Sequence, residues 1–146
     1  MIPIYGGDVL KRSRQREAIL TFLKGRTDHP TADVIYQHLK EEIPGLSPGT
    51  VYRNLALLSA AGEIARVSVG DTAEHYDGNP APHYHFFCSS CGALEDVHMP
   101  VLADLNILAG QFFPGNIAGH SVYFHGTCQH CKEVTENNLQ KVQISS

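Results

Sequence analysis

The chain has 146 residues, of which 42% are hydrophobic, so it can form one medium-sized domain or two small ones around a real core. No apolar run reaches the roughly 18 residues that a membrane span needs, and the amino-terminal sequence lacks the features of a secretory signal, so we expect a cytoplasmic protein. The net charge of −4, taken alone, argues against a nucleic-acid partner.

The charge is distributed unevenly along the chain. Residues 1–66 carry nine Lys or Arg against seven Asp or Glu, a net of +2, whereas residues 67–146 carry two against eight, a net of −6. Four basic residues lie within six positions: Lys11, Arg12, Arg14 and Arg16. This cluster can neutralise phosphates, but it can equally be the solvated start of a helix.

Two short helices are expected early in the chain. The segment RQREAILTFLKG at 14–25 has its apolar residues at helical spacing and ends at a glycine. The segment HPTADVIYQHLKEEIPG at 29–45 offers Thr31 or Asp33 as a cap, and Pro44-Gly45 is expected to end its helix.

The segment LSPGTVYRNLALLSAAG at 46–62 predicts a third helix. Ser47 is the expected N-cap and Pro48 the first helical residue, while Gly62 follows the end. One face of this helix is apolar, with Val51, Leu55 and Leu58. The opposite face is shallow and carries two long side chains with polar tips; it consists of Gly49, Tyr52, Arg53 and Ala56.

Two short strands are expected next, over EIARVSV at 63–69 and TAEHYD at 72–77, joined as a hairpin by a tight Gly70-Asp71 turn. Three helices followed by a hairpin predict a winged helix. In that fold the third helix enters the major groove of DNA, where Arg53 can bond guanine and Tyr52 can pack on a thymine methyl group.

After the turn-rich segment GNPAP at 78–82, the pattern changes to strands at 83–88 and 93–99, a helix at 100–113 and a strand at 120–128. The second half therefore predicts a small α+β unit. The polar tail after Cys131 predicts a loosely held end.

The two Cys-x-x-Cys pairs, Cys88 with Cys91 and Cys128 with Cys131, predict a structural zinc site. Each pair follows an expected strand, and two such turns complete the tetrahedral sulfur shell of a structural zinc ion, with no position open to substrate. Two redox-active dithiols are the alternative, but a single redox pair would need no second copy.

His83 and His85 are two residues apart on an expected strand, so both rings point to one face and can share an ion. Cys88 points the other way, which indicates a separate site. Asp77 and Asp96 are candidates to complete the histidine shell. Imidazole and carboxylate ligands suit Fe(II) or Mn(II) better than a thiolate cage does.

Four segments in this order and spacing resemble the ferric uptake regulator superfamily: HPTAD at 29–33, GTVYRNL at 49–55, HYHFFCSSCG at 83–92 and GTCQHC at 126–131. The resemblance covers nearly the whole chain. It implies a homodimeric, metal-dependent repressor that binds a double-stranded DNA operator. It also implies a winged-helix domain over residues 1–76, a hinge over 77–82 and a dimerisation and metal-binding domain over 83–146.

The resemblance also implies a regulatory ion bound by one histidine of the first domain together with ligands of the hinge and the second domain. These ligands are His29, Asp77, His83, His85 and Asp96. His29 enters only through the resemblance, since a lone histidine before proline is usually a loop residue. Binding the ion would fix the angle between the domains and select the form of the dimer that fits DNA.

Within the superfamily, Asp77, HYH and the aspartate at position 96 are similar to the peroxide-sensing repressors. That similarity implies Fe(II)-catalysed oxidation of His29 or His83 by hydrogen peroxide and release from DNA. Arg53 is closer to the iron regulators. The iron regulators often have a further metal site with acidic ligands and a histidine. Tyr84 and Ala103 stand at the positions of its acidic ligands, and only its histidine is matched, by His120.

Other functions stay open. An iron- or zinc-responsive uptake regulator is the main alternative. A non-haem iron oxygenase using His83, His85 and a carboxylate is remote, because it would leave the winged helix unexplained. We expect no enzyme activity, no membrane association and no small organic ligand.

Overall fold

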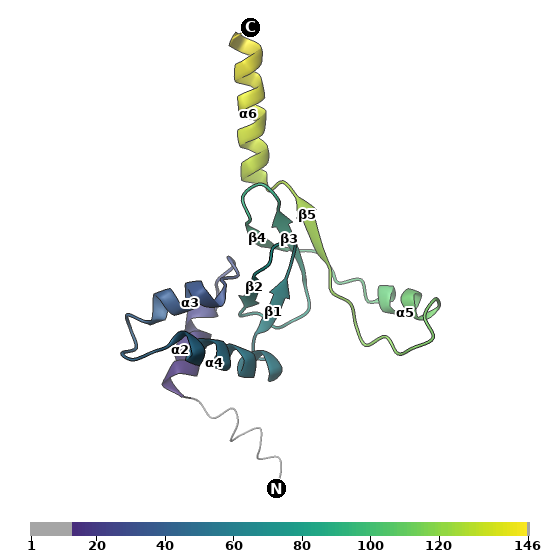
Figure 1. Cartoon of the computed structure of the whole chain (residues 1–146). Helices are drawn as coiled ribbons and strands as arrows, with labels where there is room; N and C mark the ends of the chain where they lie inside the picture. Colours follow the sequence, from purple (N-terminus) through teal and green to yellow (C-terminus); the bar gives the residue numbers. More distant parts are fainter. Residues whose placement is uncertain (1–12, 146) are drawn as a thin grey trace. The chain divides into compact units, whose positions relative to one another are not determined.

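The computed structural model of the protein describes residues 13–145 and divides the chain into two compact units, residues 1–81 and 82–146. The described part of the first unit, residues 13–81, contains three helices and a two-stranded hairpin. The second contains a three-stranded sheet and two helices (Figure 1). Both units mix helices and strands, as the α+β prediction requires.

The N-terminal unit begins with the helices α2 (Arg14–Leu23), α3 (Ala32–Leu39) and α4 (Pro48–Ala60). Each starts at a hydroxyl N-cap whose oxygen accepts a backbone N–H of the first turn, namely Ser13, Thr31 and Ser47. The apolar faces of the helices form one buried core that includes Ile19, Leu23, Ile35, Val51, Leu55 and Leu58. Ser47 is the cap predicted for the third helix and Thr31 is one of the two candidates for the second, whereas Ser13 was not predicted as a cap.

The hairpin consists of β1 (Ala65–Ser68) and β2 (Glu74–Asp77), which pair antiparallel. The predicted two-residue turn at Gly70-Asp71 is wrong, because Ser68 pairs with Glu74 and the loop spans residues 69–73. The order of three helices and a hairpin is nevertheless the predicted winged helix. The hairpin loop at 69–73 is called the wing loop below.

The end of the second predicted helix also needs correction. α3 stops at Leu39, before the predicted stop at Pro44-Gly45. The residues between continue as turns in which Leu39 O accepts the backbone N–H groups of both Glu42 and Ile43. Ile43 is buried, so this stretch returns to the core as a turn rather than as a helix.

The C-terminal unit is built on a sheet with the strand order β4-β3-β5. The central strand β3 (Tyr84–Cys88) pairs antiparallel with β4 (Leu94–Val97) and parallel with β5 (Tyr123–Gly126). The strand β3 therefore has a hydrogen-bonded neighbour on each side. It carries His85, and His83 directly precedes its first residue.

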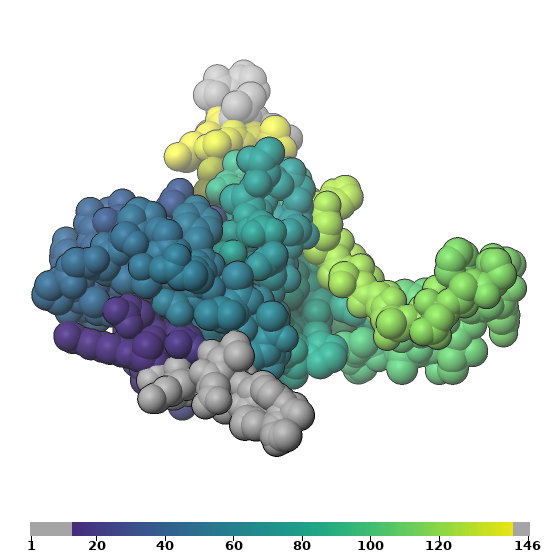
Figure 2. Space-filling model, turned by 60° about the horizontal axis from the view of Figure 1, so that its bottom comes forward, coloured from purple at the N-terminus to yellow at the C-terminus, as the bar shows by residue number. Residues whose placement is uncertain are grey.

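The helices of this unit differ from the predictions. α5 (Asp104–Gly110) is shorter than the predicted helix at 100–113, and its N-cap Ala103 offers no side-chain hydrogen bond. α5 has no buried residue, and its segment stands out from the rest of its unit (Figure 2). The tail after Cys131 forms the helix α6 (Gln129–Ser145), which was not predicted. Among the residues from 13 to 145, no helix is both long and apolar enough to cross a membrane.

Candidate metal centres

The four cysteines meet at one edge of the C-terminal sheet. β3 and β5 run parallel, and Cys88 at the end of β3 is aligned with Gly126 at the end of β5. Because parallel strands end at the same edge, the segments that follow them are neighbours. Each segment carries one Cys-x-x-Cys pair, and the four sulfur atoms lie within 4.8 Å of one another.

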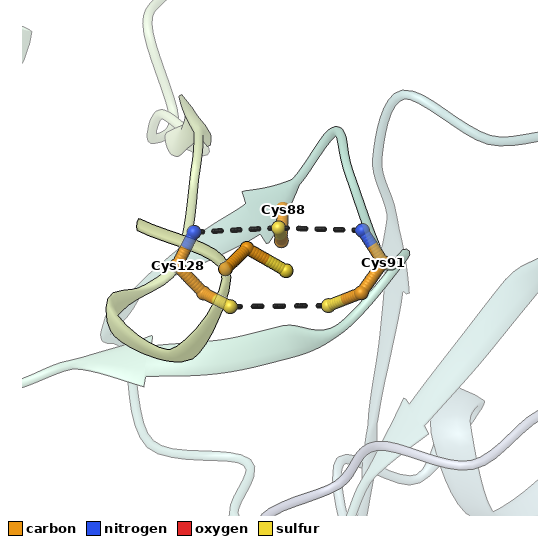
Figure 3. A group of neighbouring side chains, drawn as sticks. Cys88, Cys91 and Cys128 are labelled. Atoms are coloured by element: carbon orange, nitrogen blue, oxygen red, sulfur yellow. Dashed lines mark hydrogen bonds between the residues drawn. The ribbon is translucent and has the colours of Figure 1, made fainter. Parts of the chain in front are cut away.

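The spacing of the sulfur atoms fits a tetrahedral ion. Cys91 Sγ lies 3.8 Å from Cys128 Sγ (Figure 3). Zinc with bonds of about 2.3 Å to sulfur would place two tetrahedral sulfurs about 3.8 Å apart. Cys88 Sγ accepts hydrogen bonds from the backbone N–H groups of Cys91 and Cys128, at 3.4 and 3.3 Å (Figure 3).

The surroundings of the cysteines shift the pKa values of their thiols in opposite directions. The backbone N–H of Cys128, followed by that of Cys91, lowers the pKa of Cys88 to about 6. The pKa of Cys131 is raised to about 12, first by its hydrogen bond with the Cys128 side chain and then by burial. A divalent ion that prefers sulfur favours deprotonation of such a crowded thiol set. The four cysteines therefore fit a structural zinc ion with a closed shell.

A second cluster lies on the same sheet and consists of His83, His85 and Asp96, called the C-terminal half-site. His85 pairs with Asp96 across β3 and β4, and His83 precedes β3 by one residue. The Nε2 atoms of His83 and His85 lie 3.0 and 3.4 Å from the same Asp96 Oδ1. The two rings lie with their centroids 4.4 Å apart. Two imidazoles and a carboxylate thus converge, as the spacing of the HYH segment predicted.

His29 and Asp77 form a pair inside the other unit, called the N-terminal half-site. His29 Nε2 lies 3.4 Å from Asp77 Oδ2, and the two side chains are 0% and 3% exposed. Backbone pairing brings them together, because Thr31 forms a bridge with His75 and Tyr76 N–H donates to Pro30 O at 3.0 Å. A buried imidazole and carboxylate of this kind can serve as two ligands of an ion.

The residues predicted to contact DNA lie on the N-terminal unit. Tyr52 and Arg53 are exposed on α4, opposite its buried face. Tyr52 Oη donates to Asp33 Oδ1 at 3.3 Å, and the charge of Asp33 raises the pKa of Tyr52. On α2, Arg14 is exposed and Arg16 is half-buried. Lys11 and Arg12 of the same basic cluster lie outside the described residues.

No pattern in the sequence pointed to His75 or to the pairing of Tyr84 with His120. His75 contacts the backbone of His29 and the side chain of Asp71. Tyr84 Oη lies 2.7 Å from His120 Nε2 and accepts the backbone N–H of Leu102 at 2.9 Å. The hydroxyl group of Tyr84 therefore forms hydrogen bonds at the position where the iron regulators often have an acidic ligand.

Comparison with known proteins agrees with this architecture. A family model described as the ferric uptake regulator family matches residues 8–112. The peroxide-responsive repressor PerR of Staphylococcus epidermidis is 36% identical over 119 residues, which cover 82% of this chain and 79% of that protein.

Two solved structures extend the comparison. The peroxide stress regulator of Campylobacter jejuni has a TM-score of 0.70 at 28% identity, covering 90% of this chain and 98% of its own. The ferric uptake regulator Fur of Helicobacter pylori has a TM-score of 0.71 over 90% of this chain and 87% of its own, and at 20% identity it shows the fold alone.

A winged helix followed by a unit rich in metal-ligand side chains defines a metal-dependent regulator that binds DNA. The chain belongs to the ferric uptake regulator family. It is accordingly a metal-responsive transcriptional regulator of the repressor type, in a family of regulators rather than enzymes.

Proposed function

We propose that the protein is a repressor that senses hydrogen peroxide through an Fe(II) ion held by the two half-sites together. The observation that carries this proposal is the chemistry of the donors. The half-sites offer three imidazoles and two carboxylates, separate from the closed thiol cluster. Nitrogen and oxygen donors of this type suit Fe(II) or Mn(II), whereas the sulfur cluster suits zinc.

Each half-site would supply its share of the ligands to the ion without large rearrangement. Asp96 Oδ1 already faces both His83 and His85, and Asp77 faces His29. Since the two half-sites belong to different units of the chain, an ion bound by both would fix the angle between the units. Metal binding would then select the form of the protein that binds DNA, because only that form offers all five ligands.

Peroxide sensing follows from the same ligands. An Fe(II) ion held there would supply the catalysis of O–O bond cleavage next to the ring of His29 or His83, and the ring itself would provide the two electrons that reduce the peroxide. The imidazole carbon loses its hydrogen and gains one oxygen atom of the peroxide, while the other oxygen leaves as water. Oxidation weakens the ring as a ligand, so the half-sites separate and the repressor leaves DNA. The similarity to a peroxide-responsive repressor supports this choice among family functions.

DNA binding would use the exposed face of α4. Tyr52 and Arg53 lie on this face, where an arginine fork can bond guanine and a ring can contact thymine. Arg14 and Arg16 of α2 are assigned to phosphate contacts. This division predicts that α4 reads sequence and that α2 adds affinity that falls with salt.

The protein would act as a homodimer through the C-terminal unit. Most of the exposed large apolar side chains among the described residues lie in that unit, among them Leu102, Ile107, Leu108, Phe112, Phe113 and Phe124. Apolar surface of this kind marks an interaction site on a soluble domain. A second copy of the chain is the expected occupant. We propose that residues 83–146 dimerise, that residues 1–76 bind DNA and that residues 77–82 form the hinge.

The test combines DNA binding with mass spectrometry. Zinc-loaded protein is given Fe(II) or Mn(II), bound to a DNA fragment selected with the Mn(II) form, and treated with peroxide. The Fe(II) form should leave the DNA, and the peptide with His29 or His83 should gain one oxygen atom. The peptides with His98 and His125 serve as internal controls. DNA binding that follows metal occupancy but ignores peroxide would replace this proposal with an uptake regulator.

A further inference from the structure

His75 connects the metal ligand His29 to the wing loop within the N-terminal unit. Its Nδ1 lies 2.9 Å from the backbone oxygen of His29, and its Nε2 lies 2.8 Å from Asp71 Oδ2. Both partners, a backbone carbonyl and a carboxylate, are hydrogen-bond acceptors. Asp71 lies in the wing loop, and the ring of His75 is buried with only 9% of its residue surface exposed.

The backbone of His29 needs such support. Its φ of 51° is in the left-handed region, although the following residue is Pro30, which favours an extended conformation before it. A residue in this conformation persists only where surrounding contacts hold it. Tyr76 N–H donates to the backbone oxygen of Pro30, and the ring of His75 contacts the backbone oxygen of His29 itself.

The side chain of His29 depends on this backbone. The ring is fully buried and faces Asp77. A buried ring cannot turn freely to correct for a displaced backbone, because the packed surroundings allow few rotamers. Loss of the hydrogen bond from His75 would therefore move the imidazole nitrogen that is offered to the ion.

We propose that His75 is a positioning residue that holds His29 for the regulatory ion and, through Asp71, couples the state of that ion to the wing loop. This role rests on the proposed function. An ion bound to the ring of His29 would fix the position of the His29 backbone. The His29 backbone oxygen then fixes the ring of His75 through one hydrogen bond, and that ring fixes the Asp71 carboxylate in the wing loop through the other. By linkage, DNA that holds the wing loop raises the affinity for the ion by the same factor by which the ion raises the affinity for DNA.

Two amide substitutions separate the two hydrogen bonds of His75. His75→Asn places an amide near the position of Nδ1 and keeps the bond to His29. His75→Gln places an amide near the position of Nε2 and keeps the bond to Asp71. Asp71→Asn weakens only the wing side. His98→Gln, an exposed histidine of the other unit, is the matched control for loss of an imidazole.

The measurements use the full-length, zinc-loaded protein with Mn(II) as the probe. Mn(II) affinity is measured by the electron paramagnetic resonance of free Mn(II), with and without the selected DNA fragment. Circular dichroism and zinc content establish that each variant is folded. The spectrum of bound Mn(II) reports the ligand geometry, which a purely structural role of His75 would leave unchanged.

His75→Gln should weaken Mn(II) binding by about 10- to 100-fold, as loss of a residue that orients a metal ligand does, and should alter the spectrum of bound Mn(II). His75→Asn and Asp71→Asn should bind Mn(II) within about threefold of the wild type, but DNA should no longer raise their affinity. The His98→Gln protein should match the wild type in both measurements.

Three outcomes would overturn this role. If both amide variants bind Mn(II) as the wild type does and keep the effect of DNA, His75 positions nothing, although the proposed function stands. If both lose Mn(II) equally, His75 is needed only for packing and the division between its two nitrogens is wrong. If the zinc-loaded wild-type protein binds no Mn(II), the proposed function and the role of His75 are both wrong.

Discussion

Gly78 follows the proposed ligand Asp77 at the end of β2 and lies against the end of α2. A Cβ on Gly78 would lie 2.6 Å from the backbone oxygen of Leu23 and 2.9 Å from its carbonyl carbon. Non-bonded heavy atoms prefer about 3.5–4.0 Å, so Gly78→Ala must separate the two backbones by roughly 1 Å. Leu23 is a core residue with 1% exposure, and it cannot move without opening the core.

The expected cost of Gly78→Ala is that of an overpacked core, about 1–3 kcal/mol of the free energy of unfolding. The assay is urea unfolding of the zinc-loaded protein, followed by far-ultraviolet circular dichroism, where the midpoint should fall without a change in slope. The substitution should also displace the neighbouring residue Asp77 and thereby weaken Mn(II) binding.

Gly49→Ala is the matched control for this substitution. A Cβ on Gly49 would meet only Ser47 Oγ, at 4.0 Å, and Gly49 lies inside α4, where alanine is favoured by about 0.5–1 kcal/mol. The same chemical change should therefore shift the urea midpoint in opposite directions at the two positions. Equal stability of the two variants would refute the argument from close packing.

Further predictions concern the zinc site and the dimer. Cys88→Ser should reduce the zinc content from one ion per chain to almost none and unfold the C-terminal unit, because structural zinc contributes about 10–16 kcal/mol. His83→Ala should keep zinc and fold while losing Mn(II); equal loss of structure in both variants would contradict two separate sites. Ile107→Glu, at a position 66% exposed in the single chain, should raise the dimer dissociation constant at least about 100-fold in sedimentation experiments, because an unpaired carboxylate would be buried. Val34→Glu, at a position 44% exposed on α3, should leave the dimer intact.

The elements with local signals could be predicted from the sequence. α4 starts where Ser47 and Pro48 predicted, because an N-cap and a first-turn proline act within one helical turn. α6 could not be predicted in the same way. Its described apolar side chains Val134 and Leu139 are 44% and 58% exposed, so the single chain offers no buried stripe to reveal the helix.

The two candidate metal centres differ in how far spacing predicts them. Cys88 and Cys91 share one turn, and their repeat at Cys128 and Cys131 makes the pattern visible in one dimension. The position of His29 instead depends on pairing with β2, and its contact with His75 spans 46 residues. A single sequence carries no local signal of such a contact, so only the family resemblance could point to His29.

The arrangement of β3 predicts that the histidine centre depends on the zinc centre, but not the reverse. His85 faces Asp96 on β4, while Cys88, three residues further along, lies beside the segment that follows β5. Loss of zinc would release the edge where β3 and β5 end, so the strand that carries His85 would lose its support on that side. Loss of the regulatory ion leaves all four thiols in place. Zinc removal should therefore abolish Mn(II) binding, whereas Mn(II) removal should leave zinc bound.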